Sequence, residues 1–112
     1  MAASALVPLA AYAEAPKAYV IAEIEVFDTA AYEDYKVAVV PIVAKYGGRY
    51  IVRGGQIKPI EGEAPKGRVV VLEFANVAAA EAFLKSDEYR PVADIRHKTA
   101  KSRIIIVEGI IP

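Results

Sequence analysis

The sequence has no cysteine, no tryptophan and a single histidine. Without cysteine the chain can form no disulfide, no thiolate metal site and no cysteine nucleophile. One histidine cannot supply a haem or zinc site that needs several imidazole ligands. Fourteen basic residues balance 14 acidic ones, so net charge gives no reason to expect binding to nucleic acid or to an anionic membrane. We therefore expect no metal, no cofactor, no nucleic-acid partner and no membrane partner.

The composition is that of one folded domain. The chain has 112 residues, of which 55% are hydrophobic and 25% charged, which excludes a disordered chain. Residues 1–16 differ from the rest because they are rich in alanine and contain no Lys or Arg. We therefore predict a separate segment over residues 1–16 and a single α+β domain over residues 17–112.

The N-terminal segment has two interpretations. It ends in Ala11-Tyr12-Ala13, which has the small-x-small pattern of a signal-peptidase site, but it lacks a positively charged start. It is also too short, and too interrupted by Pro8, to span a membrane. If residues 1–13 are a signal remnant, the protein is periplasmic or secreted. If residues 1–13 instead form an alanine-rich flexible arm, we expect the protein to be cytoplasmic.

Beyond Lys17 the pattern predicts strand, helix, strand, strand, helix, strand. Stretches that alternate or are rich in β-branched residues predict strands over 18–27, 49–53, 68–74 and 102–107. Asp28, Asn76 and the pair Ser86-Asp87 are candidate N-caps for helices over 29–46, 77–84 and 89–100. This βαββαβ order with short loops predicts a ferredoxin-like α+β sandwich, with the helices over one face of the sheet.

Alternation also predicts what the uncovered face carries. If Val20, Ala22 and Ile24 face the helices, so should Tyr50, Val52, Val70, Leu72 and Phe74. The open face should then carry Tyr19, Ile21, Ile51, Val69, Val71, Ile104 and Ile106. Four strands present roughly 400 Å² of flat surface, and a monomer seldom exposes an apolar patch of that size. We predict a homodimer through the open sheet face, a dimeric α+β barrel; the alternative is a third layer supplied by the N-terminal segment.

A set of spaced residues resembles a known bacterial family. The set comprises Tyr35, Pro41, Gly47-Gly48-Arg49-Tyr50, Arg53-Gly54-Gly55, Glu61-Gly62, Arg68, Glu73-Phe74, Ser86, Tyr89, Arg96 and Glu108-Gly109. Together they resemble the family catalogued as domain of unknown function 1330, in the dimeric α+β barrel superfamily. The resemblance implies the fold and a dimer but no reaction. The superfamily includes cofactor-free monooxygenases, haem-degrading enzymes and muconolactone isomerases, which are related to this chain by fold analogy alone.

Glu73 and Arg53 are the main candidates for a site. Glu73 lies in an apolar run, where an ionised carboxylate is costly unless it is paired. Parity places it on the open face with Arg49 and Arg53. The arginines could bind an anionic or carbonyl group while Glu73 acts as a base. Alternatively, Arg–Glu pairs fix the sheet register or rim the dimer interface.

The other candidates have structural alternatives as well. His97, the only imidazole, could be a catalytic base or a surface residue on a basic helical face. Tyr35 and Tyr89 could donate phenolic hydrogen bonds to a substrate or belong to the core. Arg96 is a weaker candidate for substrate binding.

Two functions fit these residues. The first is a small ligand binder or cofactor-free enzyme, isomerase-, lyase- or monooxygenase-like, that acts on a hydrophobic organic acid, lactone or phenol. The second is a non-catalytic dimeric binding module, or a stress-related one. A cavity lined by Glu73 and an arginine favours the first function, whereas mutual pairing of these groups without a cavity favours the second.

Overall fold

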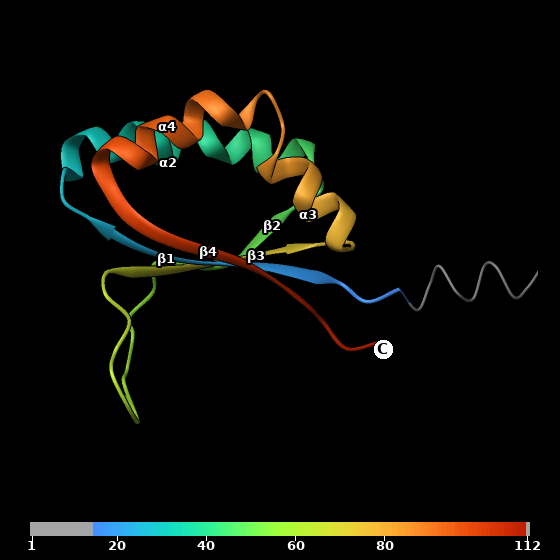
Figure 1. Cartoon of the computed structure of the whole chain (residues 1–112), viewed down its shortest axis with the longest axis horizontal. Coiled ribbons are helices and arrows are strands. Elements are labelled where there is room, and N and C mark those ends of the chain that lie inside the picture. Colours follow the sequence, from blue (N-terminus) through green and yellow to red (C-terminus); the bar gives the residue numbers. More distant parts are fainter. Residues whose placement is uncertain (1–14, 112) are drawn as a thin grey trace, which may run out of the picture.

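The computed structural model describes residues 15–111, so nearly all of the predicted signal-like segment lies outside the described residues. One antiparallel sheet with strand order β2-β3-β1-β4 carries the three helices of this described part on one face (Figure 1). The strands are β1 (Ala18–Val26), β2 (Arg49–Arg53), β3 (Arg68–Phe74) and β4 (Ala100–Glu108). The helices are α2 (Thr29–Lys45), α3 (Val77–Leu84) and α4 (Tyr89–Thr99). This confirms the ferredoxin-like order, with the second helical region divided in two. Within residues 15–111, none of the helices has the length and apolarity that crossing a bilayer requires.

Helices α2 and α3 begin directly after their predicted caps, whereas α4 has Glu88, not Ser86 or Asp87, at its N-cap position. The side chains of Asp28 and Asn76 each accept a hydrogen bond from the backbone N–H three residues later, at 3.2 and 2.8 Å. Helix α2 runs through Pro41 and is followed by Gly47, whose φ of 77° is the left-handed conformation that favours glycine. The sequence therefore sets where α2 and α3 start and where α2 stops.

The core lies between the sheet and the helices. Ala18, Val20, Ala22 and Ile24 are buried on the helix-facing side of β1, which is the face predicted from their alternation. Below α3 the rings of Phe74 and Phe83 stack with centroids 5.5 Å apart. Burying such large apolar side chains contributes about 1.5–3 kcal/mol each and holds the helical layer on the sheet.

Two strands depart from the predicted face assignment. In β2, Tyr50 lies opposite Leu72 but Val52 lies opposite Val71, because the register shifts between them. This bulge at Ile51 inserts one residue and reverses the alternation, so Val52 lies on the open face.

In β4 the error has a different origin. Ile104 lies opposite Ala22 and Ile106 opposite Val20, and residues directly opposite in an antiparallel pair share a face. Ile104 and Ile106 therefore pack on the core, whereas Ile105 and Val107 lie on the open face.

The open face keeps its apolar character after these corrections. Ile51, Val52, Ile105 and Val107 have 45%, 40%, 50% and 43% of their surface exposed. The segment of residues 54–67, between β2 and β3, projects from the sheet on the side away from the helices (Figure 1). The open side therefore carries both an apolar surface and a projecting segment.

Candidate functional site

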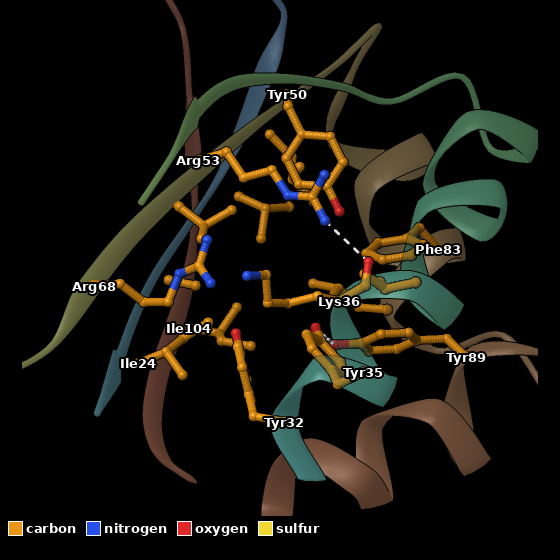
Figure 2. A pocket seen from close by; sticks show the side chains of 16 residues that line it. Ile24, Tyr32, Tyr35, Lys36, Tyr50, Arg53, Arg68, Phe83, Tyr89 and Ile104 are labelled. Atoms are coloured by element: carbon orange, nitrogen blue, oxygen red, sulfur yellow. Dashed lines mark hydrogen bonds between the residues drawn. The ribbon is translucent and has the colours of Figure 1, made fainter. Parts of the chain in front are cut away.

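A pocket lies between α2 and the helix-facing side of the sheet. Its empty volume, mouth included, is about 480 Å³, and the part in which a water molecule can be centred is about 40 Å³. The lining combines aliphatic side chains with four tyrosines, two arginines and one lysine. The polar members of the lining are Tyr32, Tyr35, Lys36, Tyr50, Arg53, Arg68 and Tyr89 (Figure 2). The pocket is therefore apolar in its body, and the charged side chains that line it are all basic.

Arg53 reaches this pocket because of the bulge in β2. The bulge places Arg53 opposite Val70, on the helix side of the sheet. Its Nη2 donates a hydrogen bond to the backbone oxygen of Lys36 at 2.9 Å, and its Cζ lies 4.5 Å from the ring centroid of Tyr50. A guanidinium held over a tyrosine face is favourable by about 0.5–1 kcal/mol at an exposed site, and here it fixes Arg53 at the pocket wall.

Arg68 enters the pocket from the first position of β3. Its Cζ lies 5.7 Å from the ring centroid of Tyr32, and its Nε is buried without a hydrogen-bond partner among the described residues. Gly54 makes room for it, because a Cβ at Gly54 would lie 2.6 Å from Nη2 of Arg68. Because Gly54 has no side chain, the guanidinium of Arg68 can pack directly against the backbone at Gly54.

A third arginine lies behind the tyrosine wall. Arg96 is only 5% exposed, and its Nη2 donates to the Tyr89 hydroxyl at 3.4 Å. Its Nη1 donates to Oγ of Ser102, and its Cζ lies 5.8 Å from the ring centroid of Tyr35. The hydroxyls of Tyr35 and Tyr89 are themselves hydrogen-bonded at 2.8 Å. A buried cation therefore stands directly behind two pocket hydroxyls.

The charges around the pocket do not cancel. Among residues 15–111, no carboxylate lies within 4.0 Å of a guanidinium nitrogen of Arg53, Arg68 or Arg96, and no Asp or Glu lines the pocket. The nearby carboxylate of Glu33 is 3.1 Å from Nζ of Lys36. Arg53 is exposed to water, whereas Arg68 is half-buried and Arg96 is buried. Because a desolvated cation is costly without a partner, Arg68 and Arg96 favour an anionic ligand.

Three of the pocket tyrosines, Tyr32, Tyr35 and Tyr50, are hydrogen-bond donors at neutral pH. Burial raises the pKa of the Tyr35 hydroxyl far above its usual value, and Tyr89 adds to this effect. Burial also raises the pKa of Tyr32 and of Tyr50, against the opposing effect of nearby arginines. A protonated phenol can donate to a ligand oxygen, but it is not a base at neutral pH.

Glu73 lies on the opposite face from this pocket. Its Oε1 accepts from Nε of Arg49 at 2.9 Å and its Oε2 from the Tyr19 hydroxyl at 3.3 Å. The hydrogen bond from Arg49 is the main cause that holds the pKa of the Glu73 carboxyl below its usual value. The prediction that Arg53 shares a face with Glu73 is wrong, because the bulge at Ile51 moves Arg53 to the helix side.

The remaining candidates separate into two groups. The structure brings Tyr35, Tyr89 and Arg96 together around the pocket wall. His97 is instead exposed on α4, with Nδ1 3.6 Å from Oδ1 of Asp94, and it does not line the pocket. Within the described part of the chain, no cluster of three His, Cys, Asp or Glu side chains could hold a metal ion.

Four pocket residues were not among the site residues expected from the sequence, although the sequence carries a signal for some of them: Arg68, Lys36, Tyr32 and Tyr50. Arg68 alternates in step with Val70, so parity already placed an arginine on the helix-facing side. Lys36 lies four residues after Tyr32, which puts both on one face of α2. A cation in register with core residues is the signal that could have identified the pocket.

Residues 17–110 match the model of a family described as Domain of unknown function (DUF1330). No curated protein matches the chain. A solved protein of unknown function from Rhodopseudomonas palustris is 18% identical, with a TM-score of 0.67 over 95% of this chain and 94% of that one. SnoaB, a cofactor-independent oxygenase from Streptomyces nogalater, is 15% identical, with a TM-score of 0.60 over 83% of this chain and 92% of that one. A dimeric protein of unknown function with a ferredoxin-like fold from Bacteroides fragilis is 13% identical, with a TM-score of 0.57 over 82% and 95% of the two chains. At these identities the likeness shows the fold alone.

Proposed function

The chain belongs to the family described as Domain of unknown function (DUF1330), and we propose that it binds a small organic acid with an apolar or aromatic body in the pocket between α2 and the sheet. The observation that carries this proposal is that the half-buried Arg68 and the buried Arg96 have no carboxylate partner within the described residues, beside an exposed Arg53 that has none either. Arg53 and Arg68 are at the pocket and Arg96 stands behind it, each near a tyrosine ring.

The pocket suits the acid group and the body separately. A guanidinium binds a planar carboxylate through two parallel hydrogen bonds. The Nε–H group of Arg68 has no hydrogen-bond partner among the described residues, so it is one donor for such a bond. Aliphatic residues such as Ile24, Val39 and Leu72 line the rest of the space and suit an apolar body. A neutral lactone or phenol fits the apolar part but leaves the arginines unpaired, so we place both below carboxylates in affinity.

The lining favours binding over acid–base catalysis. No carboxylate or imidazole among the described residues lines the pocket, and Tyr32, Tyr35 and Tyr50 are protonated at neutral pH. Proton abstraction needs a base within hydrogen-bond reach of the reacting atom. Glu73 and His97 do not supply one, because they lie outside this pocket.

We also propose that the protein is a homodimer through the open sheet face. The exposed side chains of Ile51, Val52, Ile105 and Val107 support this proposal, because monomers seldom expose contiguous apolar surface of this kind. The pairs Arg49–Glu73 and Arg103–Glu23 lie on the same face, at 2.9 and 2.6 Å. We infer that these ion pairs fix the sheet register or border the dimer interface. Glu73 then has a structural role and not a catalytic one.

A matched pair of ligands tests the binding proposal. Benzoate and benzamide have nearly the same shape, but only benzoate carries a charge. We expect benzoate to bind at least ten times more tightly in calorimetric titrations, and to shift the amide resonances of α2, β2 and β3 around the pocket. Equal affinity for the two, or no binding of any carboxylate from a panel of aromatic and aliphatic acids, would overturn the proposal.

A further inference from the structure

The hydroxyls of Tyr35 and Tyr89 have two protons between them, but the hydrogen bond that joins them uses only one. Each phenol has one O–H, and the two oxygens lie 2.8 Å apart in a single mutual hydrogen bond. That bond uses one of the two protons. No other described residue accepts a hydrogen bond from either hydroxyl. One phenolic proton at the pocket wall is therefore free to meet a ligand.

Arg96 donates a hydrogen bond to this pair. A guanidinium only donates, so the oxygen of Tyr89 accepts from Nη2 of Arg96. Either phenol can donate in the Tyr35–Tyr89 bond, because a hydroxyl oxygen can accept two hydrogen bonds. In both arrangements the proton of the phenol that accepts remains unused. Figure 2 shows the two hydroxyls meeting at one side of the pocket, with Tyr32, Lys36 and Arg68 directed toward the same space. The buried guanidinium of Arg96 thus polarises the hydroxyl pair at the pocket wall.

We propose that the Tyr35–Tyr89 pair donates to a second oxygen of the ligand, so that the ligand is an organic acid that also bears an oxo group or a hydroxyl group able to ionise. This inference rests on the proposed function, because the acid group is the one held at Arg53 and Arg68. It adds a second binding point and thereby narrows the class from carboxylates in general to oxo acids and hydroxy acids.

The charges that face the pair favour an anionic form of this second oxygen. Arg96 contacts the pair from α4, and Arg68 on β3 and Arg53 on β2 line the same pocket, while Lys36 on α2 is paired with Glu33. Hydrogen bonds to a charged oxygen are about twice as strong as those between neutral groups. We therefore expect the site to hold a phenolate or an enolate more tightly than the neutral phenol or ketone.

A chromophoric pair of probes tests this inference on the full chain. Para-hydroxy-meta-nitrobenzoate carries both groups and absorbs visible light when its phenol ionises, whereas meta-nitrobenzoate carries only the acid group. We expect the hydroxy probe to bind at least ten times more tightly. We also expect its bound phenol to ionise about one pH unit lower than in free solution, seen as growth of the phenolate band.

Variants assign the effect to the pair. Tyr35→Phe alone leaves the Tyr89 proton able to turn to the ligand, so the double variant Tyr35→Phe, Tyr89→Phe is the one used. It should bind both probes equally and abolish the spectral shift. Tyr46→Phe, outside the pocket, is the control, because the Tyr46 hydroxyl donates to Glu88. If the double variant does not fold, the comparison of the two probes on the native chain decides the question alone.

The outcomes separate the two proposals. If both probes bind equally to the native protein and the phenol ionises as in free solution, the second binding point is wrong and acid binding stands. If the spectral shift survives in the folded double variant, the pair is not its cause and the inference is wrong. If neither probe nor any simple carboxylate binds, the proposed function is wrong, and the inference falls with it.

Discussion

Arg49 and Arg53 point to opposite faces of the sheet, although they stand four residues apart in β2. In a regular strand residues i and i+4 share a face, but the register shifts between Tyr50 and Val52. Arg49 accordingly pairs with Glu73 on the open face, while Arg53 donates to the backbone of Lys36 beside the pocket. One strand therefore supplies a sheet-surface arginine and a pocket arginine of similar chemistry, which form a matched experimental pair.

This pair gives the first prediction. Arg53→Gln should lower the affinity for benzoate by tenfold or more, because a hydrogen bond to a charged group contributes about 1.5–3 kcal/mol. Arg49→Gln should leave the affinity unchanged, since its side chain lies on the other face. Isothermal titration calorimetry measures both. Equal losses in the two variants would contradict the assignment of the acid group to Arg53.

Two adjacent glycines give the second prediction. Gly54 has a φ of 69°, and a Cβ there would lie 2.6 Å from Arg68, whereas a Cβ at Gly55 would meet nothing within 4 Å. Gly54→Ala should lower the free energy of unfolding by about 1–2 kcal/mol and displace Arg68, weakening acid binding. Gly55→Ala should stay within about 0.5 kcal/mol of the native protein. Urea denaturation with a benzoate titration checks both variants, and an unaltered Gly54→Ala variant would count against the close packing of Arg68.

The buried Tyr35 predicts how stability changes at alkaline pH. Its folded-state pKa is raised above the ordinary value of 10.0, chiefly by burial. The stability that it contributes is therefore fully present below pH 10 and is lost as pH rises above it, by up to about 1.4 kcal/mol per pH unit. Tyr35→Phe should flatten this decline in urea denaturation between pH 9 and about pH 11.5. Phe83→Leu, which removes no titratable group from the same core, should keep the native slope.

The sequence predicted those features of the fold that neighbouring residues determine, and not those that depend on how distant strands pair. The caps at Asp28 and Asn76 are local, and the element order followed from them and from the strand patterns. The bulge at Ile51 has no local signal, because it arises from how β2 pairs with β3, and it moved Arg53 away from Glu73. Alternation within a strand shows which residues share a face, but it does not show which of the two faces that is. The pairing of Ile104 with Ala22 determines the face in β4, and it is opposite to the predicted one.

The same distinction applies to the site. Tyr35, Tyr89 and Arg96 were chosen by residue type, and packing of α2 against α4 brought them into one hydrogen-bonded group. That the group borders a pocket could not be read from spacing, since α4 lies far from α2 in the sequence. The exposure of His97 likewise depends on how α4 is rotated on its neighbours.

Glu73 gives a prediction at acid pH. Its folded-state pKa is lowered below 4.5, mainly by the hydrogen bond from Arg49, so the stability it contributes is present above pH 4.5 and is lost as pH falls below it. Glu73→Gln should lower the melting temperature near neutral pH, and the gap to the native protein should narrow in acid. Arg49→Gln should show the same narrowing, because it breaks the pair from the other side. A gap that stays constant with pH would show that the pair does not set this pKa.

The open face gives the last prediction. Ile105 is half exposed there, whereas its neighbour Ile104 packs on the core. Ile105→Lys should place a charge in the proposed dimer interface, and burying an unpaired ammonium costs several kcal/mol, so a folded monomer should result. Val37→Lys is the control, since Val37 is 74% exposed on α2, in the helical layer that covers the other face of the sheet.

Light scattering at micromolar concentration measures the mass of each form, and circular dichroism shows that the variants fold. The native protein and Val37→Lys should have the mass of two chains, and Ile105→Lys the mass of one. Ile104→Lys should instead unfold, because its ammonium would enter the core between the sheet and the helices. A native protein with the mass of one chain would refute the dimer, and a dimeric Ile105→Lys would move the interface away from the open face.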